Sequence, residues 1–274
     1  MKSVTEFKKR RNRSFMKAAM TLAVGLVVGY SPLSAATIID FEIAEGYTAG
    51  NNLFGQPTAG NTWDGDNNPG LSVTAAQSSP AGGQSVLVDP GQSGKSRDYL
   101  NVGSIPNQFV LEFDWLPSGP TTSASGDAAV YLSEFGLDTN DGVGPWIQFA
   151  AVGTVYQIKY LDGGFVKNIK LGMDIDNFVD QWWQVKIVGD LSTHTFDFYF
   201  DNVLEGSNLV FKNNGINDPA NSLNYLGLQA SNTGVTDFYF DNFRLTAVPV
   251  PGALWLFGSG LLGLIGISRR KKAA

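Results

Sequence analysis

Clusters of aspartate and asparagine are the groups in this sequence best suited to holding an ion. They read Asp-Gly-Asp-Asn-Asn at 64–68, Asp-Thr-Asn-Asp-Gly at 138–142 and Asp-Ile-Asp-Asn-Phe-Val-Asp at 174–180. Calcium prefers such carboxylate and amide oxygens, yet no cluster fits the twelve-residue calcium loop with its closing glutamate. Because the same residue types form ordinary turns, each cluster alone is better interpreted as a turn.

Catalytic groups are sparse. Glu112 and Asp114 lie two residues apart, which places both carboxylates on one face of a strand, as glycoside hydrolysis could use. We interpret the pair as a solvated strand face. The single histidine, His194, lies in a segment typical of a hairpin turn, with no recognisable Ser-His-Asp triad around it. No catalytic residue is predicted, although carboxylates from distant strands could still converge.

Aromatic side chains in loops are the signal for glycan binding, because a flat ring can stack on a sugar. Trp63, Tyr99 and Trp146 are the candidates, and the last follows a Gly-Pro pair. Packing in the core is the commoner role of such rings. The sequence does not identify the ligand.

The N-terminal residues 1–36 are predicted to be a signal peptide. A basic segment precedes an apolar run at 18–30, and small residues at 34–36 place signal peptidase cleavage after Ala36, or after Ala35. General secretion fits this pattern better than the twin-arginine route. Translation can begin at Met1 or at Met16 without changing the mature protein.

The C-terminus carries an apolar stretch at 253–267, which is shorter than the roughly 17–25 residues that span a bilayer. Basic residues follow directly, namely Arg269, Arg270, Lys271 and Lys272. They are expected to stay cytoplasmic, so the preceding domain lies outside. The stretch is short and rich in glycine, which favours a processing signal over an ordinary membrane anchor.

The tail resembles the PEP-CTERM family of bacterial surface proteins. Its motif is Val248, Pro249, Val250 and Pro251, followed by a Trp-, Phe- and Gly-rich hydrophobic helix at 252–267 and a basic end at 268–272. It is similar to the Val-Pro-x-Pro subset, with Val250 where the namesake glutamate stands. The resemblance implies an exosortase as partner, transient inner-membrane anchoring, and a final place at the surface or in the exopolysaccharide matrix of a Gram-negative bacterium.

The charge of the middle segment is hidden by the basic ends. The whole chain has a net charge of −6, but the two ends hold 11 of 19 basic and 1 of 25 acidic residues, leaving 8 against 24 and a net charge near −16. Such a surface repels phosphate backbones, so nucleic-acid binding is not expected. The absence of cysteine excludes disulfides and thiol catalysis.

The segment 37–247 is predicted to be one all-β domain. Short alternating runs bounded by Gly, Asn, Asp and Pro recur, and residues 47–82 read as long loops. The expected strands are 38–42, 84–88, 108–115, 128–134, 146–151, 155–160, 164–170, 182–190, 195–200, 224–230 and 237–245. The hexapeptide Asp-Phe-Tyr-Phe-Asp-Asn occurs at 197–202 and 237–242, and each copy is expected to end its strand in an Asp-Asn turn. This spacing favours a two-sheet antiparallel sandwich.

The order of these features resembles the concanavalin A-like jelly roll of lectins and glucanases, with a galactose-binding-type jelly roll as the alternative. Glucanases of this fold need a further glutamate after a Glu-x-Asp pair, and Leu116 and Pro117 stand there instead. Asp40, Glu42 and Asp241 resemble the positions where many carbohydrate-binding jelly rolls hold a structural calcium.

The leading hypothesis is therefore an exported, non-catalytic protein that binds extracellular polysaccharide or packs into the matrix. A glycan-degrading or glycan-modifying enzyme on the same fold is the alternative, and a purely structural component is the third.

Overall fold

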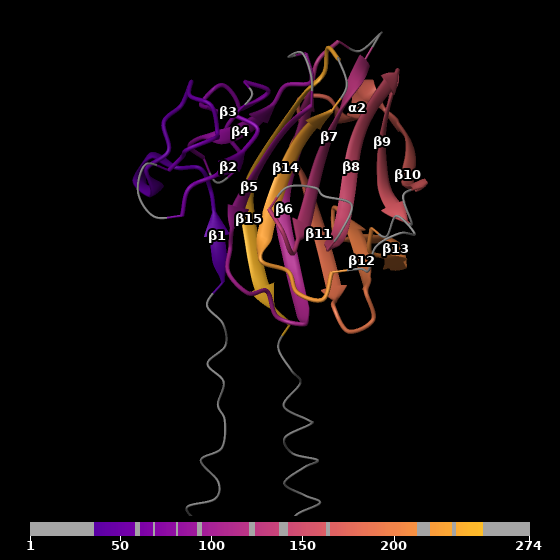
Figure 1. The fold of residues 1–274 in the computed structure, drawn as a ribbon. Helices are drawn as coiled ribbons and strands as arrows, with labels where there is room; N and C mark the ends of the chain where they lie inside the picture. The colour runs from indigo at the N-terminus through magenta and orange to yellow at the C-terminus, as the bar shows by residue number, and fades with distance from the viewer. Residues whose placement is uncertain are drawn as a thin grey trace, which may run out of the picture. The chain divides into compact units, whose positions relative to one another are not determined.

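The computed structural model describes residues 36–57, 61–67, 69–80, 82–91, 95–120, 124–136, 142–162, 165–212, 220–231 and 234–248. Within these residues the chain forms two antiparallel β-sheets packed face to face (Figure 1). The predicted two-sheet jelly-roll sandwich is confirmed. The only helical elements in the same residues are η1 (Ile43–Glu45), a 3₁₀ turn, and α2 (Ile175–Phe178).

The first sheet has eight strands in the described part of the chain. Their spatial order is β13 (Val203–Val210), β12 (Thr195–Phe200), β11 (Trp183–Asp190), β6 (Gln108–Ser118), β15 (Asp237–Ala247), β4 (Ser85–Val88) and β3 (Leu71–Thr74), while β1 (Thr37–Ile39) pairs with β15 off this path.

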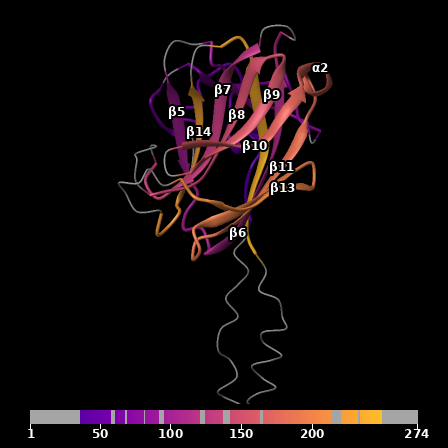
Figure 2. The ribbon, with the colours of Figure 1, turned by 90° about the vertical axis from the view of Figure 1, so that its right-hand side faces the viewer.

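The second sheet has seven strands within the same limits. Their order is β10 (Phe165–Asp174), β9 (Val155–Asp162), β8 (Val143–Gly153), β7 (Ala124–Ser133), β14 (Tyr225–Ser231), β5 (Ser96–Asn101) and β2 (Asp64–Gly65). The edge strands β10 and β13 of the two sheets contact each other and lie at the side that faces the viewer in Figure 2.

Alternation along the strands explains the core. On β6, Phe109, Leu111, Phe113 and Trp115 point between the sheets and are at most 1% exposed. Their neighbours in sequence point outward, because successive side chains of a strand face opposite sides. Phe149 of the other sheet meets Phe113 and Trp115 at ring-centroid distances of 6.0 and 4.8 Å. The two sheets thus share one aromatic core.

Four strands were missed by the sequence analysis. β2 and β3 lie inside the segment 47–82 that was expected to be loops. β5 was missed because the polar residues Ser96 and Asp98 occupy two of its inward positions. β13 was missed because it is an exposed edge strand with a bulge near Asn208. In each case the strand lacks an apolar, alternating inner face of useful length.

β15 also departs from the expected pattern. The Asp241-Asn242 pair forms no turn, since the strand continues to Ala247 through a bulge between Asp241 and Arg244. Before the bulge β15 pairs with β4, and after it with β1. The bulge therefore faces the gap between β1 and β4 along one edge of β15.

The two ends of the domain lie together. Thr37 is the register partner of Leu245, so β1 begins where β15 ends (Figure 1). Most of the predicted signal peptide and the tail beyond Val248 lie outside the described residues. In the described part of the chain, no helix has the length and apolar character needed to cross a membrane.

Candidate functional site

The structure brings Glu42 and Asp241 together at the gap between β1 and β4. Phe41 has a positive φ of 55° and its ring is buried, which turns the chain after β1. Glu42 Oε1 then accepts a hydrogen bond from the backbone amide of Gln84 at 3.1 Å. A Cβ on Gly83 would lie 1.5 Å from the same oxygen, so only glycine fits beside this carboxylate.

Asp241 is an acid without exposed surface. Its Oδ1 accepts the amide of Asn242 at 2.7 Å, while its Oδ2 is buried and has no hydrogen-bond partner among the described residues. Burial raises the pKa of Asp241 to about 7, hydrogen bonds from Ser79 and from the Asn242 amide oppose this rise, and the charges of Glu42 and Asp114 add to it. A buried oxygen of this kind is costly unless a proton, a water or a cation satisfies it.

Asn242 connects this acid to its surroundings. Its side-chain amide donates to Ser79 Oγ and to Asp114 Oδ2, both at 2.7 Å. Trp182 Nε1 donates to the carbonyl of Ser78 at 2.8 Å, which fixes the segment that carries Ser79. The expectation that Glu112 and Asp114 form a simply solvated face is wrong for Asp114, which is half-buried and hydrogen-bonded, with its pKa raised by burial.

Asp40, the third predicted calcium ligand, has a different partner. Its amide donates to Glu45 Oε2 at 3.3 Å, and its Oδ1 is buried without a partner in the described chain. Burial raises the pKa of Glu45 to about 7, and contact with the Asp40 carboxyl group adds to the effect. The two carboxyl groups therefore form a pair separate from Glu42 and Asp241.

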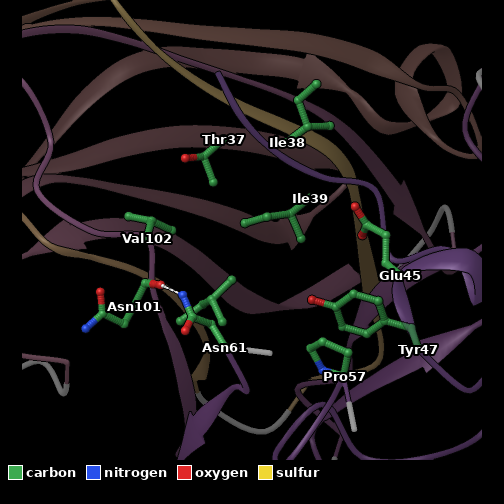
Figure 3. Close-up of a pocket in the computed structure, with 10 residues that line it drawn as sticks. Thr37, Ile38, Ile39, Glu45, Tyr47, Pro57, Asn61, Asn101 and Val102 are labelled. Carbon is green, nitrogen blue, oxygen red and sulfur yellow. Dashed lines mark hydrogen bonds between the residues drawn. The ribbon is translucent and has the colours of Figure 1, made fainter. Parts of the chain in front are cut away.

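Glu45 lines a cavity of about 300 Å³ beside β1 (Figure 3). One wall carries Glu45 and Tyr47, and the facing wall carries Asn61 and Asn101. Apolar side chains complete the lining, namely Ile38, Ile39, Pro57, Leu100 and Val102, together with Thr37. None of these lining residues was identified from the sequence, because they converge from three separate segments.

The predicted sugar-stacking tryptophans are buried. Trp63 is 1% exposed, packs on Phe41 at 6.2 Å and donates through Nε1 to the Tyr47 hydroxyl at 3.0 Å. Trp146 is 4% exposed and stacks on Tyr131 at 4.7 Å. Neither ring has the open face that a sugar needs, because each fills space between neighbouring side chains.

Tyr99 lies on the outer face of the seven-stranded sheet and is half-buried. Its hydroxyl donates to Asp64 Oδ2 at 3.1 Å, and its ring meets Tyr225 edge-on at 5.6 Å. Burial, helped by Asp64, raises the pKa of Tyr99. Tyr225 could have been found only from its pairing with Asn101 across β5 and β14, which sequence does not reveal.

Tyr131 and Trp146 share this outer face with Tyr99. A Cβ on Gly227 would lie 2.0 Å from Tyr131, so the ring covers a glycine of the neighbouring strand. Lys212 Nζ lies 4.1 Å from the centroid of the Trp146 ring. The outer face thus holds a buried aromatic pair next to the more exposed Tyr99–Tyr225 pair.

The aspartate clusters that the structure describes are not simple turns, since Asp64 and Gly65 form β2 and Asp174 caps the start of α2. Asp66 pairs with Arg97 at 3.0 Å, and Asp174 accepts the amide of Asp176 at the start of α2. The cluster at 138–142 falls almost entirely outside the described residues. Within the described ranges, no group of three or more His, Cys, Asp or Glu side chains is arranged to hold a metal ion.

Asp98 is a second fully buried acid. Both of its carboxyl oxygens lack hydrogen-bond partners in the residues described, and burial raises its pKa to about 7. It is a buried position of β5, and the charge of Asp66, which binds Arg97, adds to the rise of its pKa. A single buried carboxyl group does not make a metal-binding site.

The predicted sorting motif begins where the last strand ends. The amide of Val248 donates to the carbonyl of Gln108 at 3.0 Å, which extends the sheet by one bond beyond Ala247. Pro249, Val250 and Pro251, and the basic residues from Arg269 to Lys272, lie outside the described residues.

Comparison with known families identifies the tail. Residues 247–271 match the PEP-CTERM protein-sorting motif, which implies an exported, cell-surface protein recognised by an exosortase. No curated protein matches the chain.

Solved structures resemble the domain at low sequence identity. A carbohydrate esterase from the Shiga toxin-encoding bacteriophage phi24B aligns with a TM-score of 0.51 and 9% identity, over 68% of this chain and 90% of that one. A sialidase aligns with a TM-score of 0.49 and 11% identity over 79% of this chain, which spans only 19% of the sialidase. The Emp47p carbohydrate recognition domain aligns with a TM-score of 0.43 and 13% identity, over 73% of this chain and 94% of that one. The esterase likeness supports the fold alone.

Proposed function

We propose that this chain is an exported surface protein that an exosortase processes and whose β-sandwich binds extracellular glycan without catalysis. The observation that carries the proposal is the sorting motif, which starts directly at the end of β15. Only five residues separate Ala247 from the hydrophobic stretch that begins at Ala253. While the tail is in the membrane, the domain is held close to the bilayer on its outer side.

Mass spectrometry of the protein from the native cell surface tests the processing step. We expect the mature chain to begin near Thr37 and to lack the hydrophobic stretch. Replacing Pro249 and Pro251 by alanine should leave the tail attached, whereas Pro106→Ala, in the domain, should not. An intact tail on the mature wild-type protein contradicts the proposal.

Glycan binding is assigned to the outer face of the seven-stranded sheet at Tyr99 and Tyr225. Their rings give an apolar surface for a sugar face, and the exposed Asp64 supplies a carboxylate acceptor beside them. Aromatic rings with a few fixed polar groups are the usual composition of such a site.

A glycan array probed with the full chain in detergent tests this assignment. Tyr99→Ala should remove the signal, while Tyr199→Ala is the matched control because Tyr199 is a similarly half-buried ring on the outer face of the other sheet. Equal loss in both variants, or no signal for the wild type, rejects the site.

Calcium is proposed as a structural ion at Glu42 and Asp241. The buried, unpartnered Oδ2 of Asp241 beside the Glu42 carboxylate fits a hard cation with oxygen ligands. Asp40 is left out of this proposal because it pairs with Glu45, and the Ser79 hydroxyl, which interacts with Asp241, is proposed as a third oxygen ligand. Bound calcium would hold the gap between β1 and β4 closed at the bulge.

A glycan-degrading enzyme is the second candidate. The two carboxylates that could serve such an enzyme are Glu112 and Asp114. Asp114 is poorly suited to the role because it accepts a hydrogen bond from the Asn242 side chain. Release of reducing ends from polysaccharide by the wild type, lost in Glu112→Gln, would establish this alternative.

A further inference from the structure

The cavity beside β1 has features that neither the sorting motif nor the glycan face explains. Its volume of about 300 Å³ is at the lower end of the range for small-molecule sites. β1 forms one side and the end of β5 another, so both sheets contribute to its walls (Figure 3).

Tyr47 supplies a hydrogen-bond donor to this cavity. Its side chain is 4% exposed, and its hydroxyl oxygen accepts a hydrogen bond from Trp63 Nε1. The hydroxyl proton of Tyr47 has no acceptor among the described residues. Because a buried hydroxyl group normally donates as well as accepts, this proton is available to a ligand.

Carboxyl groups concentrate on the same wall. Glu45 lines the cavity and contacts Asp40, whose Oδ1 is buried without a partner, and Glu42 lies near enough to act on Glu45. No lysine, arginine or histidine occurs among the described residues that line the cavity. Two adjacent carboxyl groups without a counter-ion retain a proton between them, and an ammonium group bound at Glu45 would supply positive charge in place of that proton.

The opposite wall favours a hydroxylated ring. Asn61 donates through Nδ2 to the carbonyl of Asn101 at 3.0 Å, which fixes its orientation. Leu100 and Ile39, at most 6% exposed, provide apolar surface between the two polar walls. Such alternation of apolar and polar surface suits a sugar ring, which has both.

We propose that this cavity binds an amine-bearing ligand of monosaccharide size, with the ammonium group at Glu45, a hydroxyl group at the Tyr47 proton and the ring against Ile39 and Leu100. The site differs from the glycan face, since Tyr99 points to the outer side of β5 whereas Leu100, against which the ring would lie, is a buried position on the inner side. It would select an amino sugar, free or at the end of a chain, over its neutral counterpart.

Isothermal titration calorimetry of the full chain in detergent near pH 7 tests the proposal with glucosamine, N-acetylglucosamine and glucose. We expect saturable binding of glucosamine, at least about tenfold tighter than either neutral sugar, because a charge-assisted hydrogen bond is the discriminating contact. Glu45→Gln should weaken glucosamine binding about tenfold or more. Asp201→Asn, which removes the same charge from an exposed turn outside the cavity, should change it less than about twofold.

Glu45→Gln keeps an oxygen that can accept the Asp40 amide and removes a like-charge contact, so the variant is expected to fold, which its melting curve checks. Equal affinity for all three sugars, no glucosamine binding, or unchanged binding in Glu45→Gln overturns the proposal. Displacement of glucosamine by calcium would also overturn it, since the carboxyl pair would then be a metal site. Tyr99→Ala should leave glucosamine binding intact, so the two sugar sites can fail separately.

Discussion

The hexapeptide Asp-Phe-Tyr-Phe-Asp-Asn occupies two very different environments in this molecule. At 197–202 it ends β12, and Asp201 and Asn202 form an exposed turn with φ values of 48° and 63°. At 237–242 the same six residues run on through a bulge, and Asp241 is completely buried. Asn242 keeps a positive φ of 54°.

The difference lies in what adjoins each copy. β12 is followed at once by β13 in a hairpin, so Asp201 and Asn202, the last two residues of this copy, reverse the chain. β15 lies between β6 on one side and β4 and β1 on the other, so Asp241 and Asn242, the last two residues of this copy, face Glu42, Ser79 and Asp114. Identical local chemistry gives a turn in one place and a buried acid with a raised pKa in the other.

Calcium should stabilise the protein through the copy at 237–242 and not through the copy at 197–202. With calcium at about 100 times its dissociation constant, the wild type should gain about 2.7 kcal/mol, or roughly 5–10 °C in melting temperature, over the same protein in EDTA. Asp241→Asn should abolish this gain, because it removes a ligand oxygen's charge. Asp201→Asn should retain it and change stability by less than about 0.5 kcal/mol. If EDTA leaves the wild-type melting temperature unchanged, structural calcium is excluded.

Stability in EDTA should fall as pH rises. The folded-state pKa of Asp241 is about 7, above its ordinary value of 3.8, so the folded protein binds more protons between these values. Its contribution is complete below about pH 4 and is lost as pH rises through about 7, a change of roughly 4 kcal/mol at most. Denaturant titrations from pH 4 to 8 should show a shallower decline in Asp241→Asn.

The loss of stability with rising pH should not vanish in Asp241→Asn, because Glu45 and Asp98 also have pKa values raised to about 7. An unchanged slope in Asp241→Asn would show that Asp241 is not the buried acid described. Asp201→Asn should follow the wild type throughout.

Replacing Asn242 or Asn202 by glycine should give the smallest difference in the free energy of unfolding between the two copies. Both asparagines have a positive φ, so glycine removes the side chain without backbone strain. Asn242→Gly loses the hydrogen bonds to Ser79 and Asp114 and should cost about 1–2 kcal/mol. Asn202→Gly should be neutral or slightly stabilising. Equal effects on the free energy of unfolding would mean that the Asn242 contacts contribute little.

Much of the fold could be predicted because its strands have clear alternation. The run from Phe109 to Trp115 places four large apolar side chains on one face, and the structure buries all four. Alternation fails for β5, where Asp98 points inward, and for β13, where little of either face is buried. Such strands are held by their neighbours in the sheet, which a local pattern does not contain.

The candidate sites were predicted less well. The charge of Glu42 acts on Asp241, whereas Asp40 pairs with Glu45, because the positive φ of Phe41 turns the chain between Asp40 and Glu42. The calcium site stays a prediction. Trp63 lies in the core and Trp146 is buried in a small cluster on the outer face of the seven-stranded sheet, because neighbouring strands can cover a ring that stands next to polar residues in sequence. Glu45 and Tyr47 gave no signal, because their roles depend on a cavity.

The sequence by itself determined the parts that act through linear order: the sorting motif that begins at Val248, the acidic composition, and the alternating strands of a two-sheet sandwich. These depend on neighbours along the chain. Only the tertiary structure decided which acids are buried, which aromatic rings remain accessible, and where a cavity opens between Glu45 and Asn61. The two copies of one hexapeptide give the physical reason: burial and charge are set by the strands and loops packed around a residue, and those come from distant parts of the chain.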